Sequence, residues 1–166
     1  LVAVAHRHGV IRLLDARDGT PRGELLGHRG GVSTLAFLPR EPLQLLSGSW
    51  DRTVKLWDVP GRRVVREWVH DEEVHALAIG QDGGTAVSGT RNGRLQWIDL
   101  ARDGFVRRLD AHSGGVTALA ISPDGQRLAS AGMDLHIALW DWQTGERQPR
   151  ITRSMPGRRI GGQDVL

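Results

Sequence analysis

Residues 47–58 read Ser-Gly-Ser-Trp-Asp-Arg-Thr-Val-Lys-Leu-Trp-Asp, two short runs on either side of a tight turn. The turn begins at Asp51, and the second run ends at Asp58. β-Branched and large apolar side chains dominate the second run, which is typical of a strand. The stretch therefore predicts two antiparallel strands joined by a short turn.

The pattern around this stretch recurs along the chain with a period of 42 residues. The aligned positions are His28, His70 and His112, and then Val32, Val74 and Val116. The closing acids Asp15, Asp58, Asp99 and Asp141 follow at intervals of 43, 41 and 42 residues. A period in the low forties is long enough for four short strands, which is one blade of a β-propeller. Such a small sheet buries its faces only against neighbouring blades, so we predict an all-β stack of sheets.

Residues 111–151 give the clearest single repeat. Strands are expected at 116–121, 127–131 and 136–140, with a Pro-Asp-Gly turn after the first and a more polar fourth strand at about 147–151. Residues 32–37 and 74–79 occupy the place of the first strand in two other copies. We therefore expect four-stranded antiparallel blades. They divide the chain into the last three strands of one blade (1–26), three blades (27–68, 69–110, 111–151), and the start of another or a disordered tail (152–166).

Composition limits the classes of function. Cysteine is absent, which excludes disulfides and thiolate metal sites. No apolar run approaches the ~18 residues needed to span a bilayer, and no signal-peptide pattern occurs. The net charge is only +3 although the pI is 10.8, because 21 of the 22 basic residues are arginine. These arginines are scattered through every repeat, which argues against a nucleic-acid interface.

Two of the repeats resemble WD40 repeats closely. In 27–68 the resemblance rests on Gly27-His28, the Ser-Gly-Ser-Trp-Asp run at 47–51, and Leu56-Trp57-Asp58. The copy at 111–151 is similar, whereas the copy at 69–110 has Asn92 in the turn and Ile98 where the tryptophan is expected. The resemblance covers about 1–151, and three copies in register make it specific.

The resemblance implies a hydrogen-bonded tetrad of His, Ser, Asp and Trp inside each complete blade. By position the tetrads are His28, Ser47, Asp51 and Trp57, and then His112, Ser130, Asp134 and Trp140. The carboxylate would fix the imidazole tautomer, and the indole N–H would donate into the network. Asn92 and Ile98 should loosen the middle blade, and Val4, His8 and Leu14 should prevent a tetrad in the first.

Serine, histidine and aspartate also make hydrolase triads, so catalysis needs consideration. The chain has no Gly-x-Ser-x-Gly nucleophile motif, and a catalytic set would occur once, not in each repeat. His6 and His8 alternate on an expected strand, but no carboxylate lies close enough in sequence to complete a metal site. The acidic run 71–73 is expected to be a solvated loop. We therefore expect no enzyme activity, cofactor or metal.

A binding function would then lie on the face formed by the inter-blade loops. The residue just before the turn position of Asp51, and its equivalents in the other repeats, projects onto this face. These residues are Arg7, Trp50, Arg91 and Met133, with Arg29, Glu73 and His75 at the rim. The expected partner is a protein or peptide, with no membrane involved, and the resemblance implies a cytoplasmic location. The alternatives are an Arg-rich surface for nucleic acid or another acidic partner, and a regulatory module of a larger enzyme.

The number of blades affects how the chain behaves in solution. Because the chain starts in a strand-like run, we expect it to be a window of a longer propeller, although a closed four-bladed ring is the alternative. An unclosed arc would leave the apolar faces of its terminal blades bare. The chain alone is therefore expected to associate.

Overall fold

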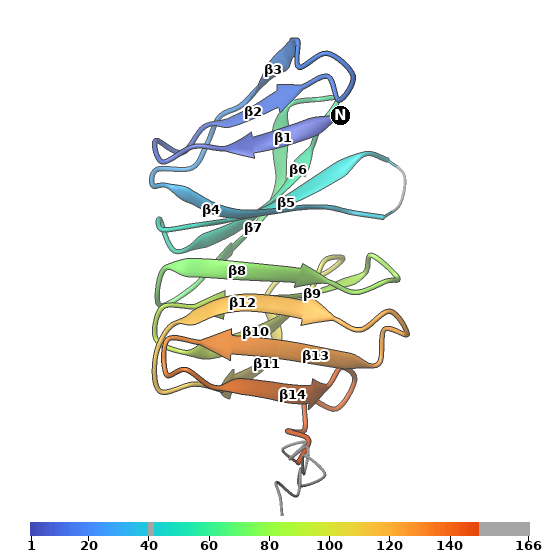
Figure 1. Ribbon diagram of the computed structural model, residues 1–166. Helices are drawn as coiled ribbons and strands as arrows, with labels where there is room; N and C mark the ends of the chain where they lie inside the picture. Colours follow the sequence, from blue (N-terminus) through green and yellow to red (C-terminus); the bar gives the residue numbers. More distant parts are fainter. Residues whose placement is uncertain (40–41, 150–166) are drawn as a thin grey trace, which may run out of the picture.

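The computed structural model describes residues 1–39 and 42–149, and these residues form fourteen β-strands in four antiparallel sheets (Figure 1). The predicted all-β architecture is confirmed. In each sheet the strands follow one another in chain order. The first sheet contains β1 (Val2–Ala5), β2 (Ile11–Leu14) and β3 (Pro21–Leu25). The second contains β4 (Val32–Phe37), β5 (Gln44–Ser49), β6 (Thr53–Asp58) and β7 (Arg63–Val69). The third contains β8 (Val74–Ile79), β9 (Thr85–Thr90), β10 (Arg94–Asp99) and β11 (Phe105–Asp110).

The fourth sheet contains β12 (Val116–Ile121), β13 (Arg127–Gly132) and β14 (Ile137–Asp141). Beyond β14, an isolated bridge joins Trp140 to Arg147, and the Gln148 N–H donates to the carbonyl of Leu139 at 2.8 Å. The fourth strand predicted for this repeat thus begins as a bridge. Its last two residues, like 152–166, lie outside the described part of the chain.

The first strand of each later sheet carries the same irregularity. Its pairing with the second strand shifts register once, skipping Ser33, His75 and Thr117. A bulge of this kind leaves one residue outside the ladder and increases the local twist. The Ser33 hydroxyl is hydrogen-bonded to the carbonyls of Gly48 (3.0 Å) and Val74 (2.5 Å), which ties one sheet to the next.

Neighbouring sheets pack face to face, and the core lies between them. β4 contacts β8 and β8 contacts β12, so these first strands run side by side through the stack (Figure 1). At each junction a valine of the incoming first strand meets a glycine of the preceding sheet. A Cβ on Gly48 would lie 2.6 Å from Val74 Cγ1, and one on Gly89 2.4 Å from Val116 Cγ1. Close approach of the two sheets therefore requires glycine there.

The described residues form an open arc with the β1–β3 and β12–β14 sheets at opposite ends (Figure 1), and not a closed four-bladed ring. Within residues 1–39 and 42–149, no sheet packs on the outer face of the β12–β14 sheet. Ile137 on this face is 71% exposed, whereas Val54 and Leu95, at the same place in the two inner sheets, are 0% exposed. The inner sheets are thus covered on both faces and the terminal one on a single face.

Candidate functional site

The first polar network lies inside the β4–β7 sheet. His28 comes from the connection before β4, Ser47 from β5, Asp51 from the turn and Trp57 from β6. Trp57 Nε1 donates to Ser47 Oγ at 2.7 Å, Ser47 Oγ lies 2.7 Å from His28 Nε2, and His28 Nδ1 lies 2.8 Å from Asp51 Oδ2. Since the carboxylate accepts from Nδ1–H, Nε2 is the acceptor for the serine hydroxyl. The four residues form one continuous chain of hydrogen bonds.

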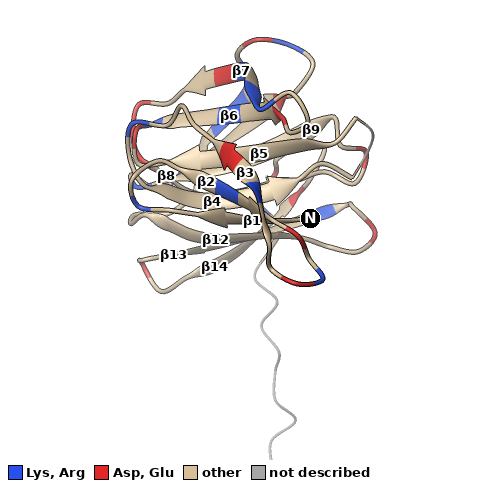
Figure 2. Ribbon diagram, turned by 90° about the horizontal axis from the view of Figure 1, so that it is seen from above, with Lys and Arg blue, Asp and Glu red and all other residues tan. Residues whose placement is uncertain are grey.

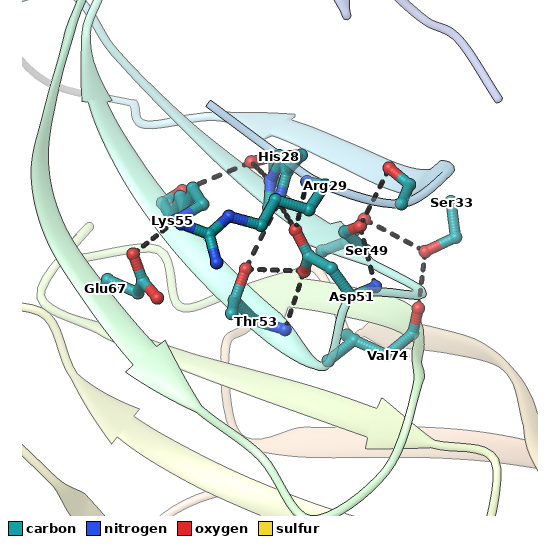
Figure 3. Close-up of polar contacts among 12 residues, drawn as sticks. His28, Arg29, Ser33, Ser49, Asp51, Thr53, Lys55, Glu67 and Val74 are labelled. Carbon is teal, nitrogen blue, oxygen red and sulfur yellow. Dashed lines mark hydrogen bonds and ion pairs between the residues drawn. The ribbon is translucent and has the colours of Figure 1, made fainter. Parts of the chain in front are cut away.

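Asp51 is the hub of this network. Besides His28, its carboxylate accepts the Arg29 N–H at 2.8 Å, the Thr53 N–H at 3.0 Å and the Thr53 hydroxyl at 2.7 Å (Figure 3). Burial acts to raise the pKa of Asp51, but these hydrogen bonds outweigh it and lower the pKa to about 2. Burial lowers the pKa of His28, against the opposing effect of Asp51. A neutral imidazole therefore faces an ionised carboxylate.

The second network repeats this geometry in the β12–β14 sheet. His112 Nδ1 lies 3.0 Å from Asp134 Oδ1, His112 Nε2 lies 2.8 Å from Ser130 Oγ, and Trp140 Nε1 donates to Ser130 Oγ at 2.8 Å. The Ser113 N–H donates to Asp134 Oδ2, as the Arg29 N–H does to Asp51. The structure thus brings together the four residues of each tetrad named from the sequence.

The β8–β11 sheet keeps only half of the network. His70 Nε2 still lies 2.7 Å from Ser88 Oγ, but its Nδ1 donates to the Trp68 carbonyl at 3.2 Å. Asn92 instead accepts a hydrogen bond from the Thr90 hydroxyl. In the β1–β3 sheet, His8 is exposed and Val4 is partly exposed, so the equivalent residues there are not buried together.

An exchange of residue sizes across two paired strands compensates for the missing tryptophan. Trp57 pairs with Val64 across β6 and β7, whereas the equivalent pair in β10 and β11 is Ile98 with Phe105. The Phe105 ring packs edge-on against His70, with centroids 4.8 Å apart. Sequence reasoning missed Phe105. The available signal was that a fourth-strand aromatic residue occurs in the complete copy that has isoleucine, Ile98, at the tryptophan position of the third strand.

We expect the free energy of unfolding to decrease as the pH is lowered from 7, because of His70. Burial lowers the pKa of His70 from 6.5 to about 4, so the unfolded chain binds a proton more tightly than the folded one. The free energy of unfolding should decrease by about 2 kcal/mol between pH 7 and pH 5, and the loss should level off below the folded pKa. Urea unfolding across this range measures the slope, to which His28 contributes in the same direction.

The control for this pH dependence is His70→Gln, which removes the titrating group. It should flatten most of the slope above pH 5, whatever its effect on stability at pH 7. Asp51 acts in a separate window, because its lowered pKa removes stability only below about pH 4. An unchanged slope in the variant would contradict the assignment to His70.

The four proposed contact residues lie in equivalent turns at one end of the sheets. The backbone N–H of Trp50 donates to the carbonyl of residue 31, that of Arg91 to residue 73, and that of Met133 to residue 115, at 2.8–2.9 Å. The turn of one sheet also packs against the next, since a Cβ on Gly31 would lie 3.2 Å from the Arg7 carbonyl oxygen. Arg7, Trp50, Arg91 and Met133 therefore follow one another along a single surface, which we call the turn face.

Trp50 is the largest apolar group on the turn face and is held in a fixed position. Its indole lies against Gly31, where a Cβ would come within 2.8 Å of Trp50 Cε3. Trp50 is nevertheless 52% exposed. In the next sheet Glu73 replaces this glycine, and its carboxylate lies 3.7 Å from Arg91 Nη1 and 3.4 Å from His75 Nε2. The face thus combines an aromatic platform with a polar group of three residues, Glu73, His75 and Arg91.

Other sequence-based candidates do not form sites. His6 and His8 lie in the turn after β1, not on a strand as expected. Over residues 1–39 and 42–149, no three His, Asp or Glu side chains are placed to hold a metal ion. The same residues contain no helix long and apolar enough to cross a membrane. In the view of Figure 2, basic and acidic positions alternate along the ribbon of the described residues.

Comparison with known proteins gives consistent matches. The family model described as WD domain, G-beta repeat, matches residues 19–58 and 104–141. WD repeat-containing protein 3 of Homo sapiens is 29% identical over 124 residues, which is 75% of this chain and 13% of that protein. Small ribosomal subunit protein RACK1y of Oryza sativa subsp. japonica is 31% identical over 128 residues, covering 76% of this chain and 38% of the relative.

A solved structure gives the same result in three dimensions. A chain in the crystal structure of the Mitotic Checkpoint Complex matches with a TM-score of 0.80 and 27% sequence identity, covering 87% of this chain and 45% of that one. This chain therefore spans less than half the length of each protein compared here.

Proposed function

Because the chain belongs to the WD40-repeat family, we propose that it is a non-catalytic platform that binds a protein or peptide on its turn face. The observation that carries this proposal is the half-exposed indole of Trp50, fixed against Gly31. A rigid aromatic side chain loses little entropy on binding, and tryptophan and arginine are enriched among the residues that dominate interface energies. Trp50 and Arg91 are the proposed anchors, with Arg7 and Met133 beside them.

The burial of the tetrads supports a structural role for them over catalysis. Ser47 is 0% exposed, and the His28 side chain is also fully buried. A serine nucleophile must reach a substrate, but the Ser47 hydroxyl is enclosed between an indole N–H and an imidazole. WD40 proteins generally act as interaction scaffolds, and the structural neighbour belongs to a multi-protein complex. The partner's identity, the use of this particular face and a cytoplasmic location stay predictions.

The double variant Trp50→Ala, Arg91→Ala tests the proposal. It should lose partner capture from a cell extract while its melting temperature stays nearly unchanged, because both side chains are exposed. The matched control is Val106→Ala, Arg102→Ala, two exposed residues of the β10–β11 region away from the turn face. Partner capture that survives the first pair and is lost with the second would overturn the proposal. An affinity that decreases steeply as the salt concentration rises, and that Trp50→Ala does not change, would indicate a nucleic acid instead.

A further inference from the structure

We propose that the pocket between Arg29 and Lys55 receives a carboxylate side chain of the bound partner in exchange for Glu67. The inference rests on the proposed function, since it assigns an acidic residue to the peptide held on the turn face. The pocket is a hollow of about 440 Å³ between the connection that carries Gly27 and Arg29 and strands β6 and β7. It is lined by Gly27, Arg29, Asp51, Thr53, Lys55, Glu67 and Val69, and Figure 3 shows the polar and charged members of this set.

Lys55 is an unusual residue to find at the base of this pocket. It is the only lysine in the chain, and its side chain is only 7% exposed. The equivalent positions in the next two sheets are Gln96 and Ala138, so the repeat does not require a cation there. A buried ammonium is strongly disfavoured without a negative partner. Lys55 therefore requires a carboxylate partner, and the equivalent residues of the next two sheets do not.

Glu67 is the carboxylate that pairs with Lys55, and it does so from the solvent-exposed side of the pocket. Its carboxylate pairs with Lys55 Nζ across β6 and β7, yet the Glu67 side chain is 43% exposed. A half-exposed carboxylate is rehydrated when it leaves such a pair, so another carboxylate can take its place provided that Lys55 is not left unpaired. The buried member of the pair is thus fixed and the exposed member is replaceable.

Arg29 provides the second cation of the pocket. Its backbone N–H is fixed by Asp51, while its exposed side chain makes no ion pair within residues 1–39 and 42–149. A guanidinium holds a carboxylate through two parallel hydrogen bonds. Asp51 does not compete for these donors, because its oxygens already accept from His28, Thr53 and the Arg29 backbone.

Charge balance selects a carboxylate as the occupant. The pocket holds two cations, Arg29 and Lys55, and two carboxylates, Asp51 and Glu67. When Glu67 turns into water, one incoming carboxylate restores neutrality, whereas a dianionic group would leave excess negative charge in a partly buried site. Trp50 immediately precedes Asp51, so an acidic residue close to the partner's apolar anchor would reach the pocket.

Lysine-selective labelling with ¹³C at Cε tests the inference, because a chain with one lysine gives one side-chain signal. The probe is N-acetylglutamate N-methylamide, and its control is the glutamine analogue. The Lys55 signal should shift to saturation with the glutamate compound at millimolar concentrations and stay in place with the glutamine compound. No shift, or equal shifts with both compounds, would overturn the proposal, and the wild-type chain alone decides this.

Variants then separate this pocket from the turn face. Glu67→Gln should tighten binding of the glutamate compound about fivefold, because the competing carboxylate is gone, and Arg29→Ala should weaken it. Trp50→Ala should leave the Lys55 shift intact while removing partner capture. If Trp50→Ala leaves both the Lys55 shift and partner capture intact, the proposed function is contradicted but the carboxylate pocket is not. If Glu67→Gln weakened binding of the glutamate compound, the proposed exchange of Glu67 for a partner carboxylate would be contradicted.

Discussion

Asp51→Ala should lower the free energy of unfolding by about 4 kcal/mol, whereas Asn92→Ala should lower it by less than about 1 kcal/mol. Asp51 accepts four hydrogen bonds, and its side chain is only 9% exposed. Its removal leaves the buried His28 imidazole and two backbone N–H groups without their acceptor. Asn92 is exposed and accepts one hydrogen bond from Thr90.

The two variants form a matched pair, because both residues occupy the same turn position of consecutive blades. Urea denaturation at pH 7 of each variant beside the wild type measures the difference, provided that the slope of the transition is unchanged. Equal losses would mean that the tetrad contributes no more to stability than an ordinary turn residue does. That result would contradict the role assigned to Asp51 as the hub of the network.

The repeat itself could be predicted because its signals are visible along the sequence. Strand-forming runs and Gly and Pro turns are local to one blade, and the 42-residue spacing of histidines and valines relates each blade to the next. The tetrads could be placed because the resemblance to WD40 repeats implies them, position by position. The bulge at Ser33, His75 and Thr117 was not predicted, because a one-residue shift between two strands leaves no mark in either strand alone.

The features that distinguish one blade from another were harder to predict. The exchange of Trp57 and Val64 for Ile98 and Phe105 needs the pairing register of the third and fourth strands. The position of Trp50 depends on contact with Gly31, nineteen residues earlier in the chain. The pocket at Lys55 depends on Glu67 lying opposite it across two strands. Each of these contacts is non-local, so spacing along the sequence does not reveal it.

The chain on its own should self-associate at micromolar concentration, and Ile137→Glu should return it to a monomer of 18.2 kDa. Ala118, Ala120 and Ile137 on the outer face of the last sheet are exposed. The equivalent Ala76, Ala78 and Leu95 are all buried against the next sheet. A contiguous apolar sheet face in water favours association, and a charge at its centre opposes it.

The control is Val106→Glu, which adds the same charge at a 66% exposed valine on the outer edge strand β11. This variant should associate as the wild type does, because β11 lies away from the uncovered face. Size exclusion with light scattering over a hundredfold range of concentration separates the three proteins. A sharp monomer peak for the wild type would contradict the expectation. Association that both charges suppress equally would mean that net charge, and not the bare sheet face, controls it.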